Sequence, residues 1–204
     1  MSNLKKKFFI IFLTSFFIIG SLNSINSGIS FDEKHEELNW NFHIKLIKQI
    51  SNSIFYDKKF NKEKFEEEVQ SFVGYGIGFQ IISQPIQSFI KNILILDSNL
   101  DDYGAKLISK HFVVFLFFFI SSIFFYLILK KIIDIENFCI LGTVLYLTYP
   151  YLFGQSMFSP KDVPFMSVWL VCTYFSFVIL EKIIKGNNLR FKYIIFFSLC
   201  SAYL

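Results

Sequence analysis

The stretch His111–Leu129, HFVVFLFFFISSIFFYLIL, contains no acid, lysine or arginine and is followed directly by Lys130 and Lys131. A helix needs about 20 mostly apolar residues to cross the hydrocarbon core of a bilayer. The whole chain of 204 residues is 53% hydrophobic and only 18% charged, and its charges gather in residues 32–68 and 91–110. The sequence therefore predicts an all-α integral membrane protein, a multi-pass helical bundle.

Other apolar runs surround this stretch. Complete spans are predicted at about residues 8–30, 111–129, 138–158 and 163–180, and Pro150 is expected to end or kink the third. A fifth run, 191–204, is too short to span, so we expect residues 1–204 to be the N-terminal part of a longer transmembrane domain. The first run also resembles a secretory signal peptide, but it lacks a clear A-x-A cleavage site, which favours an uncleaved anchor.

Lysine and arginine in the short connections predict the orientation. They gather before the first span, after the second and between the fourth and fifth, which share one side if the spans alternate. The N-terminus is therefore expected to be cytoplasmic, with loops 31–110 and 157–163 on the outer face. Most lysines sit beside apolar runs, so the net charge of +4 does not indicate a nucleic-acid partner.

The long outer loop, residues 31–110, is predicted to contain amphipathic interfacial helices. Trp40, Ile44, Ile47 and Ile54 recur at about helical spacing with lysines between them, which predicts a helix on the outer membrane surface. Residues 69–90 are uncharged but rich in glycine and glutamine and contain Pro85. We expect them to form a surface or re-entrant segment.

Two groups of ionisable residues could carry chemistry. Asp32 and Glu33 directly follow the first span, where carboxylates can act as bases; alternatively, they only favour a helix start. Lys161 and Asp162 lie in the short outer turn between Pro160 and Pro164, and they are either functional or an exposed pair. His35 and His43 are about two helical turns apart, which argues against a shared metal site. No Ser-His-Asp set is indicated.

Together these groups resemble the plan of the GT-C membrane glycosyltransferases, the protein O-mannosyltransferase-like, aminoarabinose-transferase-like and rhizobial lipopolysaccharide-transferase-like families. In those families an acidic pair opens the first outer loop, as Asp32-Glu33 does here, and a second outer loop carries another acid, as Asp162 does. Residues 75–79, YGIGF, look like a YG-x-x-F element of bacterial members. Lys110-His111 stands where many have Arg-His, and residues 159–162, SPKD, stand where they often read NSKD.

The resemblance implies transfer of a sugar from a polyprenyl-phosphate donor to a lipid, glycan or protein acceptor, on the outer face of a bacterial inner membrane. Asp32, with Glu33 second, would be the general base of an inverting reaction. Asp162 would orient the first-loop helix or help to hold a divalent cation. Lys161, Lys110 and His111 would neutralise the donor phosphate, or His111 would cap the second span. The alternative from another class is a non-catalytic membrane scaffold or a transporter or flippase-like protein.

Overall fold

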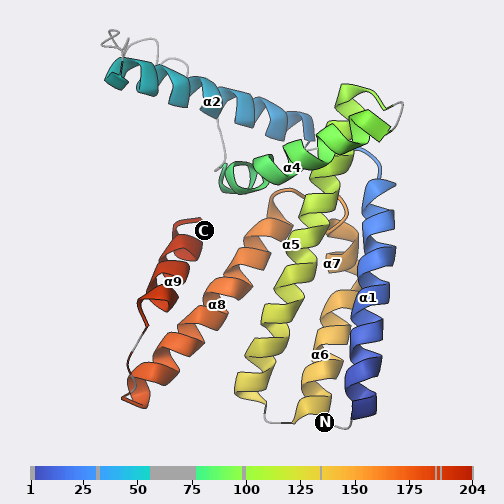
Figure 1. Ribbon diagram of the computed structural model, residues 1–204, viewed down its shortest axis with the longest axis vertical. Helices are drawn as coiled ribbons and strands as arrows, with labels where there is room; N and C mark the ends of the chain where they lie inside the picture. Colours follow the sequence, from blue (N-terminus) through green and yellow to red (C-terminus); the bar gives the residue numbers. More distant parts are fainter. Residues whose placement is uncertain are drawn as a thin grey trace.

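The computed structural model describes residues 3–30, 33–55, 77–97, 100–133, 135–186, 188 and 190–203. Throughout these ranges the regular structure is helical, as the sequence predicts. Figure 1 shows upright helices that form a bundle, with two helices lying across one end. The bundle helices are α1 (Asn3–Ile25), α5 (Asp102–Ile132), α6 (Glu136–Thr148), α7 (Pro150–Gln155), α8 (Asp162–Ile184) and α9 (Phe191–Tyr203). The crossing helices are α2 (Glu33–Phe55) and α4 (Gly78–Asp97).

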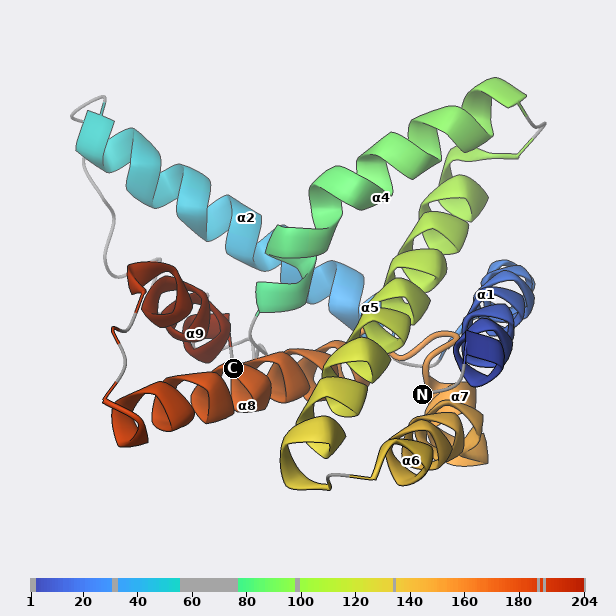
Figure 2. The same cartoon turned by 60° about the horizontal axis from the view of Figure 1, so that its bottom comes forward.

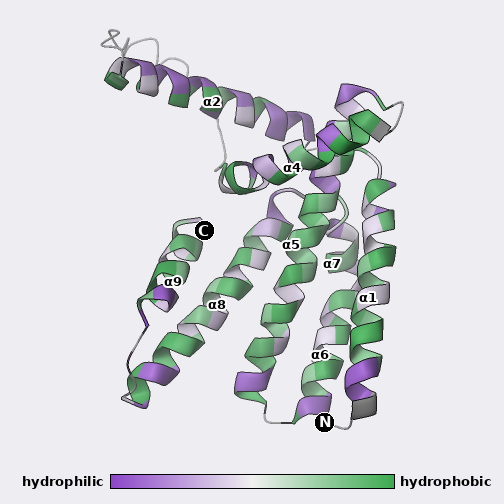
Figure 3. Cartoon of the chain, viewed as in Figure 1, coloured by the Kyte–Doolittle hydropathy of each residue, from purple (hydrophilic) through white to green (hydrophobic). Residues whose placement is uncertain are grey.

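Three of the helices in the described ranges, α1, α5 and α8, are long and apolar enough to cross a membrane. They correspond to the predicted first, second and fourth spans. In the most apolar windows of these helices only 11%, 39% and 28% of residues are buried inside the protein, so most of their apolar side chains face outwards. Figure 3 shows that the upright helices consist mostly of hydrophobic residues. Lipid tails are the surroundings that such a surface requires, and the chain is therefore a membrane-embedded protein.

The predicted third span is not one continuous helix. It is divided into α6 and α7 at Tyr149, which has the extended backbone angles φ −63° and ψ 115°. Proline disfavours helical geometry in the residue before it and cannot donate a backbone hydrogen bond, so Pro150 ends α6 and begins α7. The predicted third span, residues 138–158, therefore contains two shorter helices, with the break at Pro150 that the sequence predicts.

The central helix of the bundle is α5, which contacts α1, α4, α6 and α8. Asp101 caps its start, because the Asp101 carboxylate accepts a hydrogen bond from the Gly104 backbone N–H. Figures 1 and 2 place α1, α6 and α7 on one side of α5 and α8 and α9 on the other. The core around α5 consists largely of fully buried apolar residues, among them Val113, Val114, Phe115, Phe118, Leu147 and Val163.

The first helix packs on α5 through aromatic rings. The Phe17 ring lies 4.9 Å from Phe119 and 6.1 Å from Phe115, measured between ring centroids. Such pairs are held by dispersion as well as by their mutual orientation. This packing fixes the end of α1, and hence the start of the segment that leads into α2.

The two crossing helices lie at the end of the bundle where α1 ends and α5 begins (Figures 1 and 2). Of the YGIGF motif, Tyr75 and Gly76 lie outside the described residues. Ile77 and Phe79 are buried, and Phe79 packs edge-on against Phe117 of α5 at 5.5 Å. The described part of this motif therefore anchors the start of α4 in the bundle core.

The opposite end of the bundle holds the lysine groups. The start of α1 and the ends of α5 and α8 all lie there, at the bottom of Figure 1. Lys131 and Lys185 both pair with Glu181 at this end, at 2.5 and 2.6 Å. The three lysine groups thus share one end, as alternating spans require.

Candidate functional site

The first two turns of α2 present acidic and polar side chains to the bundle. Glu33, Glu36 and Glu37 are spaced i, i+3 and i+4, so they lie on one face of the helix. Glu33 and Glu36 are each only 3% exposed, and Asn39 is fully buried. Burial of a carboxylate destabilises a protein unless charged or hydrogen-bonding partners compensate it. The groups around these glutamates therefore decide whether α2 can pack on this end of the bundle.

Each of these glutamates has a lysine partner. Lys106 Nζ lies 2.6 Å from a Glu37 oxygen, and Lys110 Nζ lies 3.9 Å from a Glu33 oxygen. Both lysines come from the first turns of α5, four residues apart. The third partner is Lys161 from the turn before α8, whose Nζ lies 3.8 Å from Glu36 Oε1. The acidic face of α2 is therefore neutralised by two different segments of the bundle.

A buried hydrogen-bonded row joins Glu33 to the end of α1. Nε2 of His111 bonds a Glu33 carboxylate oxygen, and His111 Nδ1 lies 2.7 Å from the Ser27 hydroxyl. The Ser27 hydroxyl also lies 3.2 Å from the Met157 carbonyl oxygen, in the turn after α7. His111 is 1% exposed. The row therefore ties four segments together, and neither Ser27 nor His111 lines the pocket described below.

Helix α4 contributes side-chain amide groups to the site. The Gln80 side chain donates a hydrogen bond of 2.6 Å to Glu36 Oε2. Among the described atoms, Glu36 Oε1 has no hydrogen-bond partner, so its compensation comes from the Lys161 charge. Since α4 and the turn before α8 both reach the same carboxylate, these two segments meet at Glu36.

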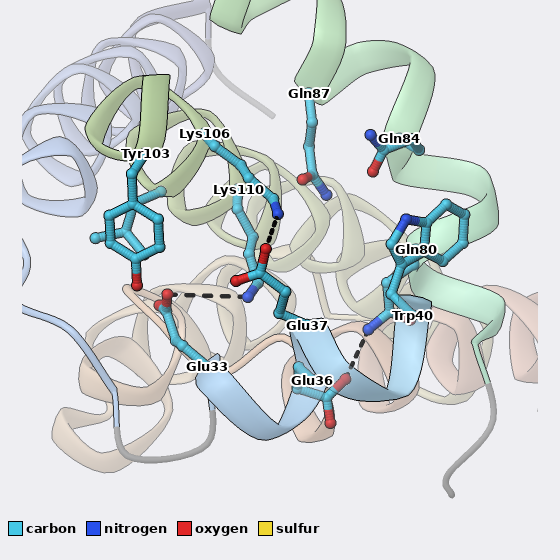
Figure 4. Close-up of a pocket in the computed structure, with 11 residues that line it drawn as sticks. Glu33, Glu36, Glu37, Trp40, Gln80, Gln84, Gln87, Tyr103, Lys106 and Lys110 are labelled. Atoms are coloured by element: carbon cyan, nitrogen blue, oxygen red, sulfur yellow. Dashed lines mark hydrogen bonds and ion pairs between the residues drawn. The ribbon is translucent and has the colours of Figure 1, made fainter. Parts of the chain in front are cut away.

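These side chains surround a pocket between α2, α4 and the start of α5, shown in Figure 4. The pocket has a cavity volume of about 40 Å³ and opens to solvent at its mouth. A cavity of this size has room for a few water molecules, so a larger ligand would extend into the open mouth. The lining consists of the three glutamates with Trp40, Gln80, Gln84, Gln87, Tyr103, Lys106, Leu107 and Lys110. In Figure 4, Trp40 and Tyr103 stand on opposite sides of this space.

The structure brings several predicted site residues together. Glu33 contacts both Lys110 and His111, and Lys161 reaches the same helix through Glu36. Asp162 is exposed in the first turn of α8, and it is the preceding Lys161 that contacts α2. Asp32 lies outside the described residues. The predicted phosphate-neutralising residues thus take part in a charged network with the first outer loop.

The residues present do not suit a divalent cation in any described part of the chain. No three His, Cys, Asp or Glu side chains are grouped there in a way that could hold a metal ion. Asp162 offers one exposed carboxylate, whereas the carboxylates of α2 already face lysines or histidine. We therefore assign no chemical step to a metal.

Sequence reasoning missed part of the site. Glu36 and Glu37 belong to the acidic run after the first span, and their spacing from Glu33 is the signal that places all three on one helical face. Trp40 was predicted only as part of an amphipathic helix, and it lines the pocket. The Ser27–His111–Glu33 row could not be found from sequence, because its members come from segments up to 84 residues apart.

Comparison of the chain with protein-family models, with curated proteins and with solved structures finds no match.

Proposed function

We propose that this protein is a membrane glycosyltransferase that moves a sugar from a polyprenyl-phosphate donor to an acceptor hydroxyl on the outer face of the membrane. The observation that carries the proposal is the Glu36–Lys161 contact at 3.8 Å, together with the Glu33–Lys110 pair. These contacts join the acidic start of the first outer loop to basic residues of α5 and of the second outer turn. Transfer from a lipid phosphate needs this combination of carboxylate and cation.

In the proposed reaction Asp32 is the general base. Its carboxylate takes the proton of the acceptor hydroxyl while the hydroxyl oxygen forms a bond to the anomeric carbon. The bond between that carbon and the phosphate oxygen breaks, and its electron pair leaves with the polyprenyl phosphate. Attack from the face opposite the leaving group inverts the anomeric centre, the same geometry as in inverting hydrolysis. The engagement of Glu33 by His111 and Lys110 supports a positioning role for Glu33, next to the base.

Lysines supply the counter-charge for the donor phosphate. Lys110 lines the pocket, and its side chain is 13% exposed, whereas Lys161 is 36% exposed. Both are paired at 3.8–3.9 Å, longer than a direct charge-assisted hydrogen bond. A phosphate that arrives between them can therefore be contacted by a small rotation of either ammonium group. A compact, flexible ammonium suits this role.

The decisive experiment is a transfer assay on membranes that contain the full chain, with a panel of radiolabelled polyprenyl-phosphate sugars. Asp32→Asn removes the base and is expected to lower transfer by about 10²- to 10⁴-fold. The control is Asp102→Asn, which changes an exposed acid of the same outer loop. Wild-type transfer by Asp32→Asn would remove Asp32 as the base. Absence of transfer with every donor would favour a scaffold or transporter.

A further inference from the structure

A groove lies between α1 and α6 at the lysine-rich end of the bundle. It has a cavity volume of about 380 Å³, far larger than that of the pocket between α2, α4 and α5, and it is open to the surroundings of the protein. Both helices pack against α5, and both begin at this end of the molecule (Figure 1). The proposed transfer chemistry uses none of the residues that line this groove.

The lining of the groove changes from polar to apolar along both helices. At its rim, in the first turns of α1 and α6, Lys5 Nζ donates a hydrogen bond of 3.1 Å to Asn137 Oδ1. Further along, the walls are aromatic on α1 and aliphatic on α6: Phe8, Phe9, Phe12, Ile140 and Val144. Spacings of three, four and seven residues place each set on one helical face. A membrane lipid has the same polarity, since its headgroup lies at the surface and its acyl chains extend inwards.

The groove also lies at the depth where a lipid headgroup meets its chains. The apolar span of α1 begins at Lys5, at the end of the helix where a lysine side chain reaches the membrane surface. Phe8 follows one turn later and is 63% exposed. An exposed phenylalanine on a membrane span is favourable against hydrocarbon and unfavourable against water. Lipid is therefore the medium that the groove contacts.

The charge at the rim favours an anionic headgroup. Lys5 has a neutral partner in the Asn137 amide, and it makes no ion pair among the residues that the structure describes. The sequence around these two residues, 1–9 and 130–137, contains five lysines and two acids. One of the acids, Glu136, already accepts a hydrogen bond from a tyrosine hydroxyl. Lysine clusters at a membrane surface attract anionic lipids, so a phosphate with a net negative headgroup fits this rim better than a zwitterion.

The size of the groove suits a hydrocarbon chain better than another helix. The part of α1 that lines it, residues 5–12, rises about 10 Å, and a helix with its side chains is about 10 Å across. A helix of that length would occupy roughly 800 Å³, about twice the cavity volume. An acyl chain is much thinner, and it is flexible enough to follow an uneven aromatic wall.

We propose that the groove between α1 and α6 binds an anionic phospholipid of the membrane leaflet at the lysine-rich end. The phosphate lies at Lys5, and one acyl chain runs along Phe8, Phe12 and Val144. The site is separate from the pocket between α2, α4 and α5, and it does not depend on the proposed transferase function. A lipid bound there links α1 to α6 at the end of the bundle where their hydrogen bond is exposed.

An indole placed in the groove reports which lipid occupies it. The chain has two tryptophans, so Trp40→Phe and Trp169→Phe remove the native indoles, and Phe8→Trp introduces one at an exposed position of the groove wall. The full chain is reconstituted in nanodiscs of phosphatidylcholine that contain a rising mole fraction of phosphatidylglycerol brominated on one acyl chain. Brominated phosphatidylcholine is used in a parallel series, because bromine quenches a nearby indole whatever the headgroup.

Lys5→Gln is the discriminating variant, because it removes the charge and keeps a side chain that can donate to Asn137. Before this change, brominated phosphatidylglycerol is expected to reach half-maximal quenching at about 3- to 10-fold lower mole fraction than brominated phosphatidylcholine. Lys5→Gln should abolish most of that difference. The matched control is Lys7→Gln, which makes the same change in net charge at an exposed lysine outside the groove and should keep the preference.

Three results would overturn the lipid site. Equal quenching curves for the two lipids would show that the groove does not select an anion. An equal loss of preference in Lys5→Gln and Lys7→Gln would show diffuse attraction to the lysine cluster. An indole that neither lipid quenches would show that protein covers the groove, either a further helix or a second copy of the chain. Independently of the introduced indole, native mass spectrometry should find phosphatidylglycerol retained by the chain with its own tryptophans and by Lys7→Gln, but lost from Lys5→Gln.

Discussion

His111 is a polar residue at the point where the apolar part of α5 begins, and it has a partner on each ring nitrogen. Its imidazole fills the space between the end of α1 and the start of α2, and it is almost completely buried. If one side chain of a buried hydrogen-bonded row is removed, the remaining polar groups stay buried without a partner. The resulting loss of folding stability is larger than the stability that the intact row contributes.

His111→Ala is expected to lower the free energy of unfolding by about 2–4 kcal/mol, because Glu33 and Ser27 both lose a buried partner. Denaturant unfolding of the purified protein in detergent measures this loss. His43→Ala is the control, since Nδ1 of His43 contacts the Asn39 carbonyl oxygen of its own helix and a much smaller change is expected. Equal stability of both variants would contradict a structural role for the row.

At the residue scale the sequence predicted ionisable groups but not their partners. Glu33, Lys110 and Lys161 could be selected from the sequence because a charged side chain beside an apolar span is energetically unfavourable and therefore uncommon. Which carboxylate faces which lysine depends on the rotation of α2 about its axis, and that rotation is fixed by contacts with α4 and α5 that no local pattern encodes. Lys161 could thus be selected as a candidate from the sequence, whereas its contact with Glu36 could not be foreseen.

At the scale of the helices, close packing explains why residue 20 is a glycine. Gly20 lies on α1 directly opposite Phe115, which is fully buried on α5. A Cβ atom added at Gly20 would overlap the Phe115 ring. Small residues let helix backbones approach closely in membranes, and this glycine allows α1 to pack against the aromatic surface of α5.

Gly20→Ala is expected to destabilise the protein by about 1–3 kcal/mol, since the buried ring has no free space into which to move. A decrease in the thermal midpoint in detergent is the measurement. Gly154→Ala serves as the matched control, because a Cβ atom added there meets nothing within 4 Å and alanine favours a helix. A decrease of equal size in both variants would show that the α1–α5 contact is not responsible.

The helices themselves were largely predictable. Apolar runs of span length correspond to α1, α5 and α8, because hydrocarbon thickness sets their length. The residues around Trp40 form a helix, α2, as the sequence predicts; its Ile47, Ile50 and Ile54 are exposed while Glu33 and Glu36 face the bundle. Periodicity predicts that a helix forms; which face of it contacts the protein depends on tertiary packing.

At the scale of the whole molecule, the two ends of the bundle carry different residues and helices. One end carries the lysine-rich helix ends, and the other carries α2, α4 and the pocket (Figures 1 and 4). The positive-inside rule predicts that the lysine-rich end is cytoplasmic. That orientation places the pocket on the outer face, as the proposed function requires.

Cysteine labelling tests this orientation. In a variant without Cys139, Cys172 and Cys200, Lys48→Cys or Lys185→Cys introduces one exposed thiol at either end of the molecule. A membrane-impermeant maleimide applied to intact spheroplasts is expected to label the protein with Lys48→Cys. The protein with Lys185→Cys should react only after permeabilisation. The reverse pattern would invert the orientation and move the pocket to the cytoplasm.

The contact between Glu36 and Lys161 has a consequence for biosynthesis. About 125 residues separate its two members in the chain. At roughly 5–20 residues per second, a ribosome needs about 6–25 s after it has made Glu36 to reach Lys161. During that interval Glu36 has no Lys161 to compensate its burial, so the first outer loop is expected to stay hydrated until the turn before α8 arrives. The compensated burial of Glu36 is then completed late, when the turn before α8 arrives.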